Sequence, residues 1–131
     1  MNKHKRYNIG ILIGGVHTYF PKEHISGIAT AAKELDINVC FFLCTQTKDF
    51  FEDMLGGTHK DSFDYQFNTI HDYSLMGGLD GLIINYGTLG LQLKNETAEK
   101  FAHKFNSIPT VFLTEIVHAH NCHSLICDNR Q

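Results

Sequence analysis

Hydrogen-bonding and aromatic residues follow each of five apolar runs in the sequence, and their types suit ligand binding. They are His17, Thr18, Tyr19 and Phe20 after the first run, Thr45 and Gln46 after the second, Asn85, Tyr86 and Thr88 after the third, Thr114 and Glu115 after the fourth, and Asp128 and Asn129 after the fifth. Aromatic faces pack against apolar ring surfaces, while amides and carboxylates accept hydrogen bonds from hydroxyl groups. The set therefore suits a neutral ligand that is polyhydroxylated or heterocyclic, although ordinary loop ends are polar as well.

A histidine-rich stretch, HAHNCH, offers a different chemistry. His118, His120, Cys122 and His123 are all residue types that bind zinc. Four ligands within six residues do not easily surround one tetrahedral ion, and the stretch joins two predicted strands. We expect a solvated loop here, with no metal site and no cofactor.

The sequence lacks the motifs of several enzyme classes. No glycine-rich turn ends in Gly-Lys-Ser or Gly-Lys-Thr, as a P-loop requires. The stretch IGGVHTYF lacks the third glycine of the dinucleotide fingerprint, and a phosphoacceptor receiver would carry an aspartate where Asn85 stands. No nucleophile elbow is present, and Cys44 is predicted to lie inside a strand. We therefore expect no catalysis in this chain.

Composition and charge are those of an ordinary globular domain. The 131 residues are 43% hydrophobic and 19% charged, with a formal net charge of -3, which predicts one domain without a broad nucleic-acid surface. Residues 1–6 are predicted to form a basic N-terminal tail. No apolar run reaches the roughly 20 residues of a membrane span, and no signal peptide is recognisable. We expect a cytoplasmic protein without membrane contact, whose Cys40, Cys44 and Cys127 are reduced thiols behaving as small hydrophobic residues.

The five apolar runs predict the framework that positions the polar residues. They are YNIGILIGG (7–15), INVCFFLCT (37–45), DGLIINY (80–86), PTVFLTE (109–115) and HSLICDN (123–129). Their continuous hydrophobicity is typical of strands covered on both faces, as in a parallel sheet between helices. In such a sheet ligands bind beyond the carboxyl ends of the strands. We expect LII of the third run to be core and NYGTLG to be the rim of a crevice, where Gly87 lets the backbone turn.

Segments with helical periodicity separate the runs. The predicted stripes are Ile25, Ile28, Ala29, Ala32 and Leu35 in residues 21–36, Phe67, Ile70 and Ser74 before Gly77, and Ala98, Phe101, Ala102 and Phe105 in residues 95–106. Residues 45–65 form an unusually long connection, with a short helix expected near residues 50–55. The alternation predicts a three-layer α/β doubly wound sheet with the flavodoxin-like order 2-1-3-4-5.

The order and spacing of these elements resemble a known family. The segments YNIGILIGG, YFPKEHISGIATAAKELDINVCFFLC, LDGLIINYG, IPTVFLTE and SLICDNRQ resemble the N-terminal lobe of periplasmic-binding-protein-like sensor domains, found in transcription regulators of the lac and purine repressor type. The end ICDNRQ resembles the family's Val-x-x-Asp-Asn-x-x-Gly junction to the second lobe. FDYQFNTIHDYSLMGGLDGLIINYGTLG is similar to bacterial signalling proteins whose sensor lobes accompany diguanylate cyclase, histidine kinase or DNA-binding output domains.

The resemblance implies one lobe of a type I clamshell, spanning residues 7–131, that closes on a small molecule such as a sugar or nucleoside. Tyr19 and Phe20 match the family's aromatic pair, Asp128 its hinge-proximal aspartate, and Asn85 with Tyr86 the polar end of its third strand. No helix-turn-helix precedes the first run and no second lobe follows, so we expect half a clamshell. We also expect a homodimer and no direct contact with nucleic acid.

Two alternatives stay open. One is a small flavodoxin-like enzyme that uses His17 or Glu115 in the same crevice. The other is a dimerisation module without a ligand, in which residues 21–36 and the long connection pair with a second copy. Because no paired acid and base can be named, the sequence favours sensing over catalysis, but it does not separate sensing from dimerisation.

Overall fold

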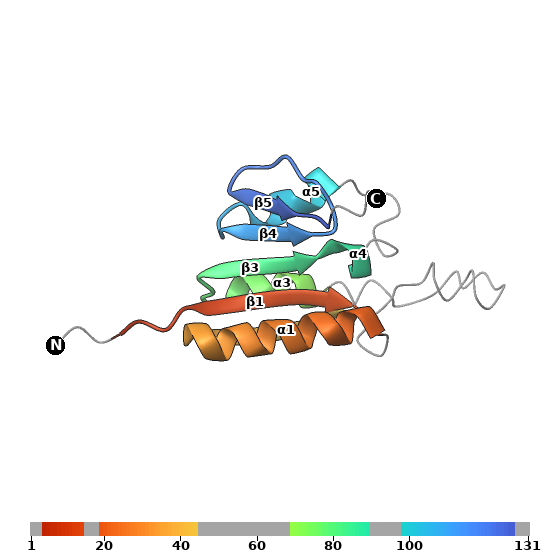
Figure 1. Cartoon of the computed structure of the whole chain (residues 1–131). Coiled ribbons are helices and arrows are strands. Elements are labelled where there is room, and N and C mark those ends of the chain that lie inside the picture. Colours follow the sequence, from red (N-terminus) through yellow and green to blue (C-terminus); the bar gives the residue numbers. More distant parts are fainter. Residues whose placement is uncertain (1–3, 15–18, 45–68, 90–97, 128–131) are drawn as a thin grey trace.

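The sheet is entirely parallel, as the continuous apolar runs predicted. A computed structural model describes residues 4–14, 19–44, 69–89 and 98–127. The strands in these ranges are β1 (Asn8–Gly14), β2 (Asn38–Cys44), β3 (Gly81–Asn85), β4 (Thr110–Leu113) and β5 (Cys122–Leu125). They lie in the order β2-β1-β3-β4-β5 with every neighbouring pair parallel. Figure 1 labels β1, β3, β4 and β5 of this sheet. The predicted doubly wound α/β fold is therefore confirmed.

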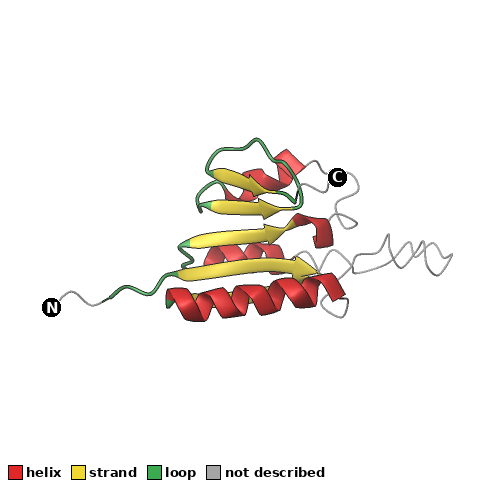
Figure 2. Ribbon diagram, viewed as in Figure 1, coloured by secondary structure: helices red, strands yellow, loops and turns green. Residues whose placement is uncertain are grey.

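Helices cover the two faces of the sheet unequally. Helix α1 (Tyr19–Leu35) lies on one face, whereas α3 (Thr69–Met76) and α5 (Ala98–Ala102) lie on the other, as Figure 2 shows. The 3-10 turn η3 (His103–Phe105) continues α5, and the short helix α4 (Tyr86–Leu89) follows β3 directly. Right-handed crossovers produce this arrangement, because the β1 to β2 connection moves across the sheet in the direction opposite to the later ones.

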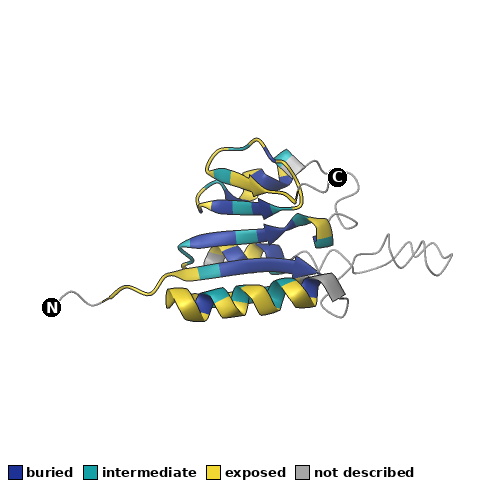
Figure 3. Ribbon diagram, in the orientation of Figure 1, coloured by how far each residue is buried: buried dark blue, intermediate teal, exposed yellow. Residues whose placement is uncertain are grey.

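The main core lies between the sheet and the face that carries α3 and α5. Its buried residues are Leu12, Leu82, Ile84, Leu89, Phe101, Ala102, Phe105, Ile108, Phe112 and Val117. The ring of Phe101 makes edge contacts with Phe105 and Phe112, at centroid distances of 5.3 and 6.4 Å. Figure 3 shows the burial concentrated in the central strands. Each fully buried Leu, Ile or Phe contributes about 1.5–3 kcal/mol, so this cluster carries much of the stability.

Helix α1 is buried less deeply than its periodicity predicted. Ala32 is buried and Ile25 and Ile28 are half-buried, which confirms the middle of the predicted stripe. The prediction is wrong at Ala29, which is exposed, and at Leu35, which is 67% exposed. The reason is that α1 packs over β2, an edge strand with a described neighbouring strand on one side only.

The C-terminal end of α1 has a well-defined cap. Asp36 adopts a φ of 53°, and the N–H of Ile37 donates to the carbonyl of Ala32 at 3.1 Å. A residue in the left-handed region directly after a helix is a common stop, because it turns the chain away and lets following amides satisfy the last carbonyls. The cap leads the chain straight into β2.

Coverage on both faces was predicted for all strands and is wrong at the two edges of the sheet. In β5, Leu125 is 63% exposed, and in β2, Leu43 is 49% exposed. Each edge strand has one neighbouring strand among the described residues, and its residues are less buried than those of β1 or β3. Cys40 and Cys127 were predicted to be reduced thiols that behave as small hydrophobic residues; both are free cysteines and both are exposed.

The other two predicted helices are both present in the part of the chain that the structure describes. Helix α3 ends at Met76, and Gly78 follows with a φ of 65°, so the predicted glycine stop is confirmed. The helix predicted for residues 95–106 is α5 followed by η3, with Phe101 and Phe105 buried as its stripe predicted. The long connection 45–65, its expected helix, and Phe67 lie outside the described residues.

The basic N-terminal segment forms ion pairs with aspartates that precede strands β2 and β3. Lys5 Nζ lies 3.0 Å from Asp80 Oδ1, and Arg6 Nε lies 3.1 Å from Asp36 Oδ1. These pairs are solvent-exposed, and such pairs are worth about 0–1 kcal/mol each. None of the described helices is long and apolar enough to cross a membrane.

Candidate ligand-binding site

Thr88 joins the carboxyl ends of the two central strands. Its Oγ1 accepts a hydrogen bond from the Gly14 N–H at 2.9 Å and donates to the Asn85 carbonyl at 2.7 Å. Gly14 ends β1 and Asn85 ends β3, so one hydroxyl links backbone groups of both strands. Thr88 was predicted as a site residue, and in the structure its hydroxyl holds the ends of β1 and β3 together.

Thr114 makes a second link at the same edge of the sheet. Its Oγ1 accepts from the Gly87 N–H at 2.7 Å and donates to the Leu113 carbonyl at 2.5 Å. A Cβ placed on Gly87 would lie 2.5 Å from Oγ1 of Thr114. Gly87 does not have the positive φ of a glycine turn, so the predicted reason for this glycine is wrong. Close approach of Thr114 is what excludes a side chain.

Asn85 is the buried polar centre of this edge. Its side chain is 1% exposed, and its Nδ2 lies 2.5 Å from Nδ1 of His24 on α1. Its Oδ1 is buried and has no hydrogen-bond partner among the described residues. A buried acceptor without a donor costs about 1–3 kcal/mol. The site therefore contains an acceptor that a bound donor would satisfy.

Tyr86 is placed differently from the predicted rim of the crevice. Its ring is half-buried against the main core, with centroids 6.1 Å from Phe101 and 5.9 Å from Phe112. Both rings belong to the face that carries α5, whereas the side chain of Asn85 reaches α1 on the opposite face. The side chain of Asn85 therefore points toward the candidate site, whereas that of the next residue, Tyr86, packs in the main core.

Other predicted site residues are only partly placed. Glu115 is exposed after the end of β4. Tyr19 and Phe20 begin α1, but their side chains lie outside the description. The remaining residues lie outside the described ranges altogether: His17, Thr18, Thr45, Gln46, Asp128 and Asn129. The structure therefore brings Asn85, Thr88 and Thr114 to one edge of the sheet. That the other residues belong to the same site remains a prediction.

His24 is the residue that the sequence analysis did not select. It lies half-buried in the first turns of α1 and contacts Asn85 across 61 residues of sequence. A crossover helix begins at the carboxyl edge of the sheet, so polar residues of its first turns are also near the crevice. That rule would have included His24, but its pairing with Asn85 is a tertiary contact that no local pattern reports.

The histidine-rich loop does not gather metal ligands. Among the described residues, no group of three His, Cys, Asp or Glu side chains could hold a metal ion. His118, His120 and His123 are exposed, whereas Cys122 packs against the main core. Burial raises the pKa of the Cys122 thiol, which favours its protonated form.

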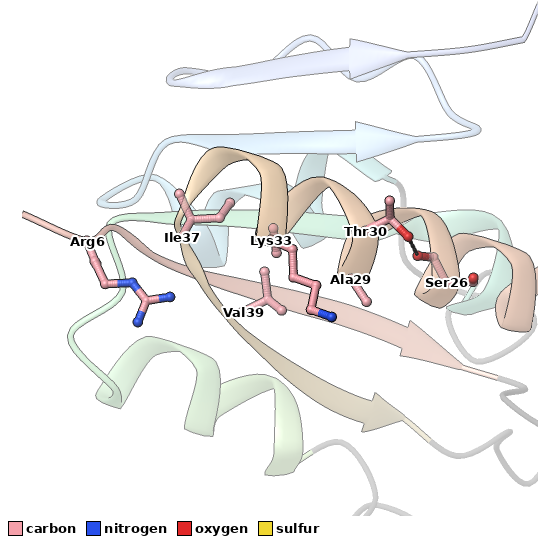
Figure 4. A pocket seen from close by; sticks show the side chains of 8 residues that line it. Arg6, Ser26, Ala29, Thr30, Lys33, Ile37 and Val39 are labelled. Atoms are coloured by element: carbon pink, nitrogen blue, oxygen red, sulfur yellow. Dashed lines mark hydrogen bonds between the residues drawn. The ribbon is translucent and has the colours of Figure 1, made fainter.

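A separate groove runs between α1 and β2 (Figure 4). It has a volume of about 490 Å³ and is lined by Arg6, Ser26, Ala29, Thr30, Ala32, Lys33, Ile37 and Val39. The groove is open and shallow, and small side chains of α1 form one wall while Val39 comes from β2. Strand alternation places Phe41 and Leu43 on the same face as Val39, so an apolar strip extends the groove along β2.

Neither a family model nor a curated protein sequence matches the chain. Among solved structures, similarity is found to a chain in the crystal structure of the lac repressor dimer bound to operator and the anti-inducer ONPF. The likeness is one of fold. The TM-score is 0.60 at 16% sequence identity, and the match covers 95% of this chain. The chain spans about a third of the repressor chain, 36% of its length. The similarity supports the lac repressor-like fold that the sequence resemblance implied.

Proposed function

We propose that this chain is a small-molecule sensing lobe of a bacterial transcription regulator or signal-transduction protein. It binds a neutral sugar or nucleoside-like compound at the carboxyl edge of the sheet, without catalysis or cofactor, in the cytoplasm. The observation that carries the proposal is the buried Asn85 amide, whose Oδ1 has no donor among the described residues. It lies at the place where α/β sheets bind ligands.

The chemistry of the described edge favours a neutral ligand. Asn85 Oδ1 is an acceptor, Glu115 adds an exposed carboxylate, and none of the described hydrogen bonds at this edge involves a lysine or arginine. Hydroxyl and N–H groups match acceptors, whereas phosphate or carboxylate groups need cationic donors. The likeness to a lac repressor fold supports the same class of role at the level of architecture.

Signalling requires more than this lobe. A ligand shifts a conformational equilibrium only by its difference in affinity for the two states. A second lobe that closes over the carboxyl edge would provide that difference, since it encloses the ligand from the other side. We propose that such closure is read out by an output domain elsewhere in the regulatory protein.

The test is a thermal-shift screen of the full-length protein against neutral sugars and nucleosides. We expect at least one compound to raise the melting temperature, and Phe20→Ala to reduce that shift, because Tyr19 and Phe20 are proposed as the aromatic pair of the site. Absence of a shift with every compound would refute sensing of these classes. Conversion of any compound to a product would instead support the enzyme alternative with His17 or Glu115.

A homodimer is the proposed assembly, and the groove along α1 favours it. Leu35 is exposed at the end of α1, and Leu43, which belongs to the apolar strip described above, is exposed on β2. A second copy would cover both. We expect sedimentation equilibrium to show a dimer whose dissociation constant rises at least tenfold in Ala29→Glu, while the control Lys22→Glu, elsewhere on α1, leaves it unchanged. A monomer at all concentrations would contradict the assembly.

A further inference from the structure

A side-chain hydrogen bond joins His24 on α1 to Asn85 on β3, and its donor can be identified from the two atoms involved. Nδ2 of Asn85 lies 2.5 Å from Nδ1 of His24. An amide nitrogen donates hydrogen bonds and has no lone pair for accepting one, so Nδ1 of His24 is the acceptor. With the Asn85 amide in this orientation, the contact assigns the ring proton of His24 to Nε2.

The neighbouring hydroxyl groups leave the other end of the amide unsatisfied. Thr88 donates its proton to the backbone carbonyl of Asn85, and Thr114 donates to the carbonyl of Leu113. Neither proton is available to Oδ1 of Asn85, which is buried without a partner among the described residues. Buried polar atoms in proteins nearly always have a partner. Because Asn85 ends β3 at the carboxyl edge, where α/β sheets bind ligands, the missing donor here points to a bound molecule.

We infer that His24 is a positioning residue that makes the site specific for a ligand group donating a hydrogen bond. By engaging Nδ2, His24 presents only the carbonyl oxygen of Asn85 to the ligand. A hydroxyl or a nucleobase N–H satisfies that oxygen, whereas a fluorine, an N-methyl group, a carbonyl or a phosphate oxygen does not. This inference rests on the proposed function, because it specifies the ligand chemistry of the same site.

The first experiment needs no ligand and tests the positioning directly. Nitrogen-15 NMR of the histidine rings in the protein should show Nδ1 of His24 unprotonated and Nε2 protonated. A correlation across the hydrogen bond should connect Nδ1 to the side-chain amide of Asn85. A proton on Nδ1 of His24 would mean that the amide has the opposite orientation, and it would overturn the inference whatever the protein binds.

The second experiment tests specificity with matched probes. Calorimetric titration of the full-length protein would compare D-galactose with its monodeoxyfluoro analogues, and uridine with 3-methyluridine. We expect one substitution in a binding probe to weaken affinity about tenfold to a hundredfold, because fluorine and N-methyl groups cannot donate. If every analogue bound as tightly as its parent compound, the inferred specificity for a hydrogen-bond donor would be wrong. Binding of none of the probes would refute the proposed function for these classes, and the NMR result would still decide the positioning.

Variants separate positioning from a merely structural role. His24→Phe keeps a ring but removes the acceptor, so the Asn85 amide is free to reverse and the discrimination between donor and analogue should fall about tenfold. His24→Gln offers an acceptor oxygen to Nδ2 of Asn85 and should restore the discrimination between donor and analogue. His103 makes a similar contact, its Nδ1 lying 3.2 Å from Nδ2 of Asn106, but in an exposed position away from the site. His103→Phe should therefore leave the discrimination unchanged.

A buried water is the competing occupant of the Asn85 acceptor. If water alone satisfies Oδ1, the side-chain amide signals of Asn85 will keep their positions with every probe that binds. That result would overturn the specificity. A shift of these signals that is produced by a donor-bearing probe and absent with its non-donating analogue would support it.

Discussion

Lowering the pH from 7 to 5 should destabilise the folded protein through one buried side chain, His71. This residue lies on α3, is 1% exposed, and has no hydrogen-bond partner for either ring nitrogen among the described residues. Its ring meets the ring of Phe101 edge-on at a centroid distance of 5.2 Å. Burial lowers the pKa of the imidazole from 6.5 to about 4; the charge of Lys104 acts in the same direction, and Asp72 opposes it.

The sign and size of the effect follow from proton binding. The folded state binds the proton on His71 more weakly than the unfolded state does. The free energy of unfolding therefore has its full value above pH 6.5, the pKa of an unfolded histidine, where His71 is neutral in both states. It decreases progressively as the pH falls from about 6.5 to about 4. Because one pKa unit corresponds to about 1.4 kcal/mol, the free energy of unfolding should be lower by about 2 kcal/mol at pH 5 than at pH 7.

The assay is urea unfolding followed by circular dichroism at a series of pH values between 5 and 7. His71→Phe should remove the pH dependence in this range, because phenylalanine keeps the edge contact with Phe101 and has no proton to bind. At pH 7 the variant should be as stable as wild type or about 1 kcal/mol more stable, since it buries no unpaired nitrogen. His103→Phe removes an exposed histidine and should keep the wild-type slope.

One result would refute this reasoning. If wild type and His71→Phe lose the same free energy between pH 7 and pH 5, then His71 is not the group that takes up the proton. The slope would then belong to other titrating groups, and the burial of His71 would carry no penalty for its charged form.

Five further substitutions, at four positions, test the carboxyl edge, helix α1 and its cap by the same unfolding assay. Gly87→Ala should destabilise by about 1–3 kcal/mol, because its Cβ would collide with Thr114. Gly27→Ala, in open space within α1, should stabilise by about 0.5–1 kcal/mol. Thr88→Val should cost about 1–3 kcal/mol, and Thr88→Ser should recover most of it, since the hydroxyl links β1 to β3. Asp36→Gly should change stability by less than about 1 kcal/mol, because relief of the positive φ offsets two exposed ion pairs.

The fold was predictable because each strand carries its own signal. A continuous apolar run of strand length predicts a strand between two layers, and crossover rules then fix the strand order. The errors lie where burial depends on neighbours. Leu35 and Leu125 have the residue type of the core, but Leu35 ends a helix that packs on the edge strand β2, and Leu125 lies on the edge strand β5. Local sequence does not report which strand is at an edge.

The candidate site was predictable only in outline. The rule that ligands meet the carboxyl ends of parallel strands selected Asn85 and Thr88, and the structure places both at that edge. The hydrogen bond from Asn85 to His24 spans two elements, so it could not be deduced before the packing of α1 was known. The need for glycine at position 87 also comes from a distant residue, Thr114, rather than from the local turn.

The exposed strand β5 has a practical consequence for handling the protein. Among the described strands its only neighbour is β4, and Leu125 and Ile126 are exposed at its carboxyl end. Unpaired amide and carbonyl groups next to apolar side chains are a template for strand addition by another molecule. Concentrated solutions of the chain should therefore precipitate or form irregular aggregates over time. A charged substitution at position 125 is the first change to make for a sample that stays soluble.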